Sequence, residues 1–202
     1  MLKLLRELQA IAQSGLAYSK DHYDIERFNR VLQLSAELLA TNSSHKYEDL
    51  LPVFVNEKGY ATPKVGVRGA VFKDEKILLV KERQDNRWSL PGGWCDVNFS
   101  AKENIQKEIQ EEAGYLSNVI KLISLTDMSK DTEKHGWPYI YEILFLCEIT
   151  ENLNKFDQGE ILDVGFFNLK DLPPLSAERC SLKQLEKCQA HFMNRLLATE
   201  FD

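Results

Sequence analysis

The stretch GGWCDVNFSAKENIQKEIQEEAGY, residues 92–115, joins a glycine-rich turn to an acidic segment with the pattern of a helix. Ser100 and Glu103 stand in the register of a capping box, and Gly114 follows at a place where a left-handed residue commonly ends a helix. The sequence therefore predicts a helix over residues 100–113. The two glycines before it permit a backbone shape that is closed to other residues.

Three glutamates, Glu108, Glu111 and Glu112, crowd one side of this helix. Glu108 and Glu112 lie one turn apart, and such a pair of like charges costs roughly 0.2–0.5 kcal/mol in an isolated helix. A solvated acidic face is one interpretation. However, the side opposite the apolar residues carries another set, Glu103, Gln106, Lys107 and Gln110. Glu108 and Glu112 fall at the edge of the apolar stripe, where burial makes unpaired carboxylates costly, and a hard cation such as Mg²⁺ or Mn²⁺ removes that cost.

The periodicity of the remaining chain predicts two domains. Residues 1–58 show apolar residues at three- and four-residue spacings and no strand pattern, which predicts an N-terminal helical domain. From residue 59 onward period-two patterns appear, and the tail predicts an amphipathic helix from Ser181 through Leu196. The predicted strands lie in VGVRGAVF, KILLVKE, VIKLISLTD, YIYEILFLCEI and DVGFFNL. Residues 59–202 are therefore expected to form an α/β or α+β sandwich.

Composition excludes several classes of protein. The net charge of −6 argues against a broad electrostatic grip on nucleic acid, because duplex binding uses a basic face. No apolar run is long enough for a signal peptide or a membrane span, so we expect a cytoplasmic protein that does not enter the membrane. The four cysteines have no zinc spacing and are expected to be reduced.

The acidic helix and its loop resemble the Nudix box, G-x5-E-x7-R-E-U-x-E-E-x-G-U, where U is aliphatic. The matching residues are Gly93, Glu108, Ile109, Glu111, Glu112 and Gly114. Phe99 stands where the motif has Glu, and Lys107 where it has Arg. In the family these two residues brace the loop against the helix, so we expect a hydrophobic brace through Phe99. The resemblance covers nearly all of the chain, because the N-terminal part is similar to a bacterial Nudix subfamily with a helical domain.

The resemblance implies a Nudix α/β/α sandwich with a mixed sheet. It also implies hydrolysis of a nucleoside diphosphate linked to another moiety, of the ADP-ribose or CDP-choline type, with Mg²⁺ or Mn²⁺. The products are a nucleoside monophosphate and phospho-X. A homodimer is expected on the same ground.

The family's metal ligands carry over to Glu108 and Glu112. Glu111 is a further ligand, a ligand through water or the base. A carbonyl of Gly92 or Gly93 is expected to complete the coordination. Glu160 stands in a late loop where many members place a further catalytic glutamate, although an exposed loop residue is an equal interpretation.

Three residues are candidates for substrate binding. Arg68 can hold a phosphate or form a structural ion pair, Trp94 can stack on a base or pack in the core, and His135 lies in a polar loop that can border the pocket. Two other functions remain open at this point: a non-catalytic nucleotide-sensing Nudix module and an RNA-end-processing hydrolase. The acidic charge balance disfavours the second.

Overall fold

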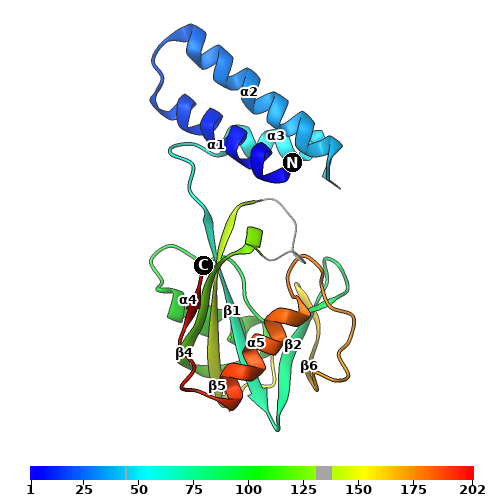
Figure 1. Cartoon of the computed structure of the whole chain (residues 1–202). Coiled ribbons are helices and arrows are strands. Elements are labelled where there is room, and N and C mark those ends of the chain that lie inside the picture. The colour runs from blue at the N-terminus through cyan, green and yellow to red at the C-terminus, as the bar shows by residue number, and fades with distance from the viewer. Residues whose placement is uncertain (44, 131–137) are drawn as a thin grey trace. The chain divides into compact units, whose positions relative to one another are not determined.

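The computed structural model describes residues 1–43, 45–130 and 138–202 (Figure 1). The chain divides into two compact units, whose main parts are Met1–Pro63 and the residues from Lys64 onward. Within the described ranges no helix is long and apolar enough to cross a membrane. The cytoplasmic location and the domain boundary at residue 58 stay predictions.

The first unit is helical. Its helices are α1 (Leu2–Tyr18), α2 (His22–Thr41) and α3 (Tyr47–Asn56). Asp21 caps the start of α2, because its side chain accepts a hydrogen bond from the backbone N–H of Asp24. The three helices share one small core of Leu5, Ala12, Leu32, Ala36, Leu39, Leu50 and Phe54. The three- and four-residue spacing of apolar residues in this part of the sequence correctly predicted helices.

A mixed sheet forms the centre of the second unit. Its strands are β1 (Lys64–Lys73), β2 (Lys76–Glu82), β3 (Trp88–Ser89), β4 (Tyr115–Asp127), β5 (Ile140–Asn152), β6 (Ile161–Phe167) and β7 (Glu200–Phe201). They lie in the order β3-β2-β1-β5-β4-β7, and β6 pairs with β2. The pairs β1–β5 and β4–β7 are parallel, whereas the other pairs are antiparallel.

Two helices cover opposite faces of this sheet: α4 (Ala101–Ala113) and α5 (Leu182–Met193) (Figure 1). Alternate residues of β1 face opposite cores, as expected for a strand that is buried on both sides. Val67 and Val71 lie in one core with Ile105 of α4, while Ala70 lies in the other core with Leu185 of α5. The predicted α/β/α sandwich is confirmed.

The C-terminal tail differs from the prediction. The helix α5 ends at Met193, and Leu196, which we expected on the helix, is 94% exposed. The chain then returns to the sheet, where Glu200–Phe201 adds the parallel strand β7 to β4 and the hydroxyl of Thr199 donates to the carbonyl of Leu122. Contacts with a strand more than 70 residues earlier override the helical pattern.

Candidate active site

The glycine loop before α4 lies against β1 through backbone hydrogen bonds. The N–H of Gly69 donates to the carbonyl of Pro91, and the N–H of Val67 donates to the carbonyl of Gly93, each at 2.9 Å. Gly92 between them has φ of +145°, and a Cβ there would lie 2.1 Å from the carbonyl oxygen of Val67. Only glycine fits this position, because any side chain would collide with the backbone of β1.

Glu112 is the most buried of the three glutamates on α4, with 8% of its surface exposed. Its Oε2 accepts a hydrogen bond of 2.8 Å from the N–H of Gly92, which ties the helix to the loop. Burial raises the pKa of Glu112 to about 7, while the charge of Arg68 and the bond from Gly92 act in the opposite direction. Burial thus outweighs these two favourable contacts, and the charged form of Glu112 is disfavoured.

Glu108 is half-buried beside the same loop. Burial is also the main cause that raises the pKa of Glu108, and the positive charge of Lys107 lowers it. Its carboxylate lies against the backbone of Gly93, since a Cβ on that glycine would come within 2.8 Å of Oε1. The structure thus brings Glu108, Glu112 and the glycine loop together, as the sequence led us to expect.

Glu111 points elsewhere. It is exposed, and its Oε2 lies 3.5 Å from the Nζ of Lys107, one helical turn earlier. Among the described residues no three His, Cys, Asp or Glu side chains form a group that could hold a metal ion. Glu111 must therefore leave Lys107 and change its side-chain conformation before it can share an ion with Glu108.

The expected hydrophobic brace through Phe99 is wrong, because this ring is 52% exposed. Polar contacts fix the loop instead. The Nζ of Lys107 lies 2.8 Å from Asp96 Oδ2, and the N–H of Asp96 donates to Oδ1 of Asn104 at 2.9 Å. Asn104 is 1% exposed. The sequence shows only an Asn near the start of the predicted helix, whereas its burial and its partner are identifiable only in the fold.

Arg68 acts on the glycine loop. One guanidinium nitrogen, Nη1, donates to the carbonyls of Leu90 at 3.0 Å and Gly92 at 2.6 Å. The Nε lies 3.7 Å from Oε2 of Glu142, and both side chains are largely buried. These contacts support the structural interpretation of Arg68, and its predicted phosphate contact gains no support from them.

Glu160 lies in the loop before β6 and is exposed. Its charge contributes to the raised pKa of Glu112, so the two carboxylates are close enough to interact. Arg83, directly after β2, holds this loop by three hydrogen bonds. Its backbone N–H donates to Glu160 at 2.8 Å, and its side chain donates to Gly159 at 3.0 Å and Gln158 at 2.8 Å. No local pattern points to this arginine, because its partners lie about 75 residues further along the chain.

Two predicted substrate-binding residues remain untested. Trp94 is 50% exposed, which leaves its ring accessible for stacking. His135 lies outside the described residues.

The Arg83→Ala variant is expected to lower kcat about tenfold, because the loss of two side-chain hydrogen bonds lets the loop of Glu160 move. In a Glu160→Gln background the same substitution should have little further effect. Arg87→Ala, at an exposed position in the same turn region, is the control. A full effect of Arg83→Ala in the Glu160→Gln background would show that Arg83 does not act through Glu160.

The residues at the site fit a hard divalent cation in kind. Two carboxylates that are penalised by burial supply oxygen ligands, and the carbonyl of Gly93, which accepts one hydrogen bond from Val67, has a second lone pair to offer. Burial and the charge of Glu108 raise the pKa of the nearby Cys95 thiol, which favours its neutral form, and a neutral thiol is a poor metal ligand. A cation shared by Glu108 and Glu112 would offset the cost of their burial.

Glu112 makes the stability of the metal-free protein depend on pH. Its folded-state pKa of about 7 lies above the ordinary 4.5, so the folded state binds a proton more tightly than the unfolded state. Stability is therefore full below pH 4.5 and falls as the pH rises through 7, by about 3 kcal/mol. Urea unfolding in chelator should show this loss relative to Glu112→Gln, which does not titrate. Parallel pH profiles of the two proteins would contradict it.

Comparison with known proteins identifies the family. A model described as "UDP-X-like, N-terminal oligomerisation domain" matches residues 1–54, and the NUDIX domain model matches residues 62–193. The putative ADP-ribose pyrophosphatase YjhB of Bacillus subtilis is 41% identical over 184 residues, which cover 91% of this chain and 88% of that protein.

Solved structures agree with these matches. A UDP-X diphosphatase is 32% identical with a TM-score of 0.64, covering 99% of this chain and 96% of its own. An ADP-ribose pyrophosphatase from Streptococcus suis is 37% identical with a TM-score of 0.63, covering 70% of this chain and 100% of its own. The chain is a member of the Nudix hydrolase family.

Proposed function

We propose that the chain hydrolyses the diphosphate bond of a nucleoside diphosphate linked to another moiety, giving a nucleoside monophosphate and phospho-X. The buried carboxylate of Glu112, bonded to the glycine loop of the Nudix box, is the observation that carries the proposal. Relatives named for ADP-ribose favour a sugar-linked substrate, whereas the structure named for UDP-X leaves the linked moiety open. CDP-choline is kept as the alternative substrate type.

Mg²⁺ or Mn²⁺ is the proposed cofactor, held by Glu108 and Glu112 with the carbonyl of Gly93 and, after it leaves Lys107, Glu111. When bound, such an ion neutralises charge on the phosphate oxygens and lowers the pKa of water. The chain's own contribution is to hold the ligands in place. Arg68 and the N–H of Gly92 fix the loop and Glu112 in one geometry before substrate arrives.

Glu111 and Glu160 are the candidates for the general base. Both are exposed and can accept a proton from an attacking water. Their charges act on the buried glutamates, Glu111 on Glu108 and Glu160 on Glu112. Both assignments are therefore kept.

Incubation with ADP-ribose, UDP-sugars and CDP-choline, each with Mg²⁺ and with Mn²⁺, tests the proposal. We expect nucleoside monophosphate and phospho-X by mass spectrometry, with one oxygen from ¹⁸O-labelled water. Nucleotide binding without turnover would instead support the sensing module. Salt-dependent RNA binding with release of RNA ends would support the RNA-processing hydrolase.

Self-association as a homodimer is proposed for the N-terminal helical domain, residues 1–58. The family description of residues 1–54 supports it, and so does an apolar stripe on α1. Leu4, Leu8 and Ile11 lie at helical spacing and are 59%, 40% and 53% exposed. Stripes of this kind are commonly covered by a partner.

The Ile11→Glu variant is expected to shift the protein from dimer to monomer, because a carboxylate in an apolar interface is not paired. Light scattering after gel filtration measures the mass. Lys20→Glu, at an exposed position after α1, adds negative charge without touching the stripe and serves as the control. An unchanged dimer with native helical content in Ile11→Glu would rule out this stripe as the interface.

A further inference from the structure

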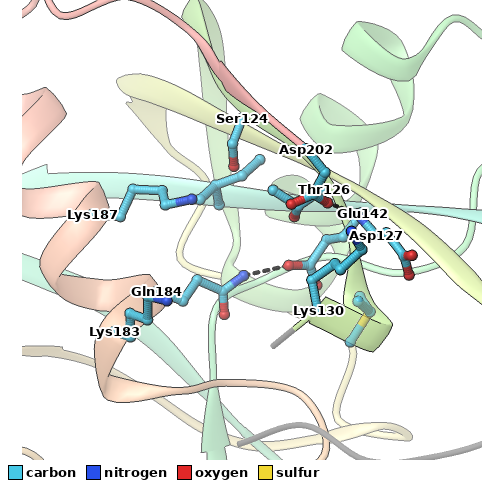
Figure 2. A pocket seen from close by; sticks show the side chains of 11 residues that line it. Ser124, Thr126, Asp127, Lys130, Glu142, Lys183, Gln184, Lys187 and Asp202 are labelled. Carbon is cyan, nitrogen blue, oxygen red and sulfur yellow. Dashed lines mark hydrogen bonds between the residues drawn. The ribbon is translucent and has the colours of Figure 1, made fainter. Parts of the chain in front are cut away.

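A pocket with a volume of about 110 Å³ lies on the α5 side of the sheet, and the function proposed above does not use it (Figure 2). It is bordered by the end of β4, the start of β5, α5 and the C-terminal Asp202. Pockets that bury a whole drug-sized ligand have about 300–1,000 Å³. This one therefore has room for one moiety of a nucleotide and not for all of it.

The floor of the pocket is a buried polar pair. Glu142 and Gln184 are 6% and 7% exposed, and Nε2 of Gln184 donates to Oε1 of Glu142 at 2.5 Å (Figure 2). Gln184 stands in the first turn of α5, where its backbone N–H donates to the side chain of Ser181. Both groups are thus held in fixed positions, as expected of a preformed binding site.

A short chain of contacts connects this floor to the catalytic loop. Glu142 lies 3.7 Å from the guanidinium of Arg68, which donates to the carbonyl of Gly92. The N–H of Gly92 in turn donates to Glu112. The pocket floor and the candidate metal ligand Glu112 are therefore connected through Arg68 and the backbone of Gly92.

The lining of the pocket offers donors and acceptors in equal measure. Three lysines and three carboxylates border it: Lys130, Lys183, Lys187, Asp127, Glu142 and Asp202. Thr126 faces the floor as well, because it pairs directly with Glu142 across the antiparallel β4–β5 ladder. This balance of charge does not select an anion.

No aromatic side chain is among the described residues that line the pocket. A nucleobase commonly stacks on an aromatic ring, and a quaternary ammonium such as choline is commonly held in an aromatic cage. Vicinal hydroxyls of a sugar, in contrast, require donors and acceptors side by side. We propose that this pocket binds a sugar ring of the substrate through its hydroxyl groups. The inference rests on the function proposed above.

Two variants test the pocket. Thr126→Val removes a hydroxyl without changing the size of the side chain, and Lys183→Met removes a charge but keeps the apolar stem. Each is expected to raise the KM for ADP-ribose about tenfold and leave kcat within twofold, since one or two hydrogen bonds to the sugar are lost far from the reacting bond. The controls are Thr150→Val on β5 and Lys170→Met after β6, both exposed and outside the lining.

The same variants assayed with CDP-choline tell which sugar is bound. An effect on ADP-ribose alone places the sugar beyond the diphosphate in the pocket, whereas an equal effect on both compounds places the nucleoside ribose there. Unchanged KM values for both compounds would overturn the proposal. A loss in Lys183→Met without one in Thr126→Val would also overturn it, because the pocket would then bind an anion.

If the wild type turns over none of the compounds, the proposed function fails, but the pocket is still testable. Calorimetric titration of ADP-ribose with Mg²⁺ should then show binding that Thr126→Val weakens about tenfold and Thr150→Val does not. Absence of binding to the wild type, or equal affinity of Thr126→Val, would overturn the sugar pocket.

Discussion

Replacing Glu112 by Gln is expected to lower kcat by about a thousandfold, which corresponds to roughly 4 kcal/mol of lost transition-state stabilisation. Gln keeps the size of the side chain and can still accept the hydrogen bond from Gly92. The substitution removes only the negative charge that would hold the cation. The fold should therefore persist while the chemistry is lost.

Steady-state kinetics with ADP-ribose, together with circular dichroism, measure this effect. Glu186→Gln, which neutralises an exposed glutamate on α5, is the matched control and should retain wild-type kcat. In chelator at pH 8 the Glu112→Gln protein should also be more stable than the wild type, because it no longer buries a charged carboxylate. Turnover within tenfold of the wild type would remove Glu112 from the metal site.

Gly92→Ala is expected to destabilise the protein by more than about 4 kcal/mol, at the upper end of single-substitution effects. The new Cβ would lie 2.1 Å from a backbone oxygen of β1, and φ of +145° is a conformation that alanine rarely adopts. The loop can escape only by leaving β1. It would then release its hydrogen bonds to Arg68 and Glu112 as well.

Gly66→Ala on β1 is the control for this variant. A Cβ at Gly66 would lie 3.5 Å from the carbonyl oxygen of Gly93, which is an ordinary contact, so its stability should stay close to that of the wild type. Urea unfolding of both variants gives the comparison. Equal stabilities of Gly92→Ala and Gly66→Ala would mean that the glycine loop is not fixed as the structure shows.

Signals that act over a few residues predicted the local structure well. The capping box of Ser100 and Glu103 and the left-handed Gly114, with φ of +74°, bound α4 as the sequence indicated. The period-two pattern of VGVRGAVF predicted a strand, and in β1 Val67 and Ala70 lie in opposite cores. These features depend on backbone geometry and hydrophobic periodicity, which residues close together in the sequence determine.

Contacts between distant residues were not predictable in the same way. The side chain of Arg83 donates hydrogen bonds to the loop of Glu160, which lies more than 70 residues later in the chain. The guanidinium of Arg68 donates to a backbone carbonyl of the glycine loop. The contact between the loop and α4 was mispredicted for the same reason. The ring of Phe99 is exposed, and the ion pair of Asp96 and Lys107 joins the loop to the helix. A sequence gives the residue types for such contacts, but their partners are decided by how the strands pair.

The shared ion is tested most directly by a crystal soaked in Mn²⁺ and measured for anomalous scattering. We expect one strong peak between the carboxylates of Glu108 and Glu112 beside the carbonyl of Gly93, at about 2.1–2.2 Å from the oxygens. The peak should disappear in Glu112→Gln. A wild-type crystal without anomalous signal there, with Glu108 turned into solvent, would contradict the assignment of these glutamates as metal ligands.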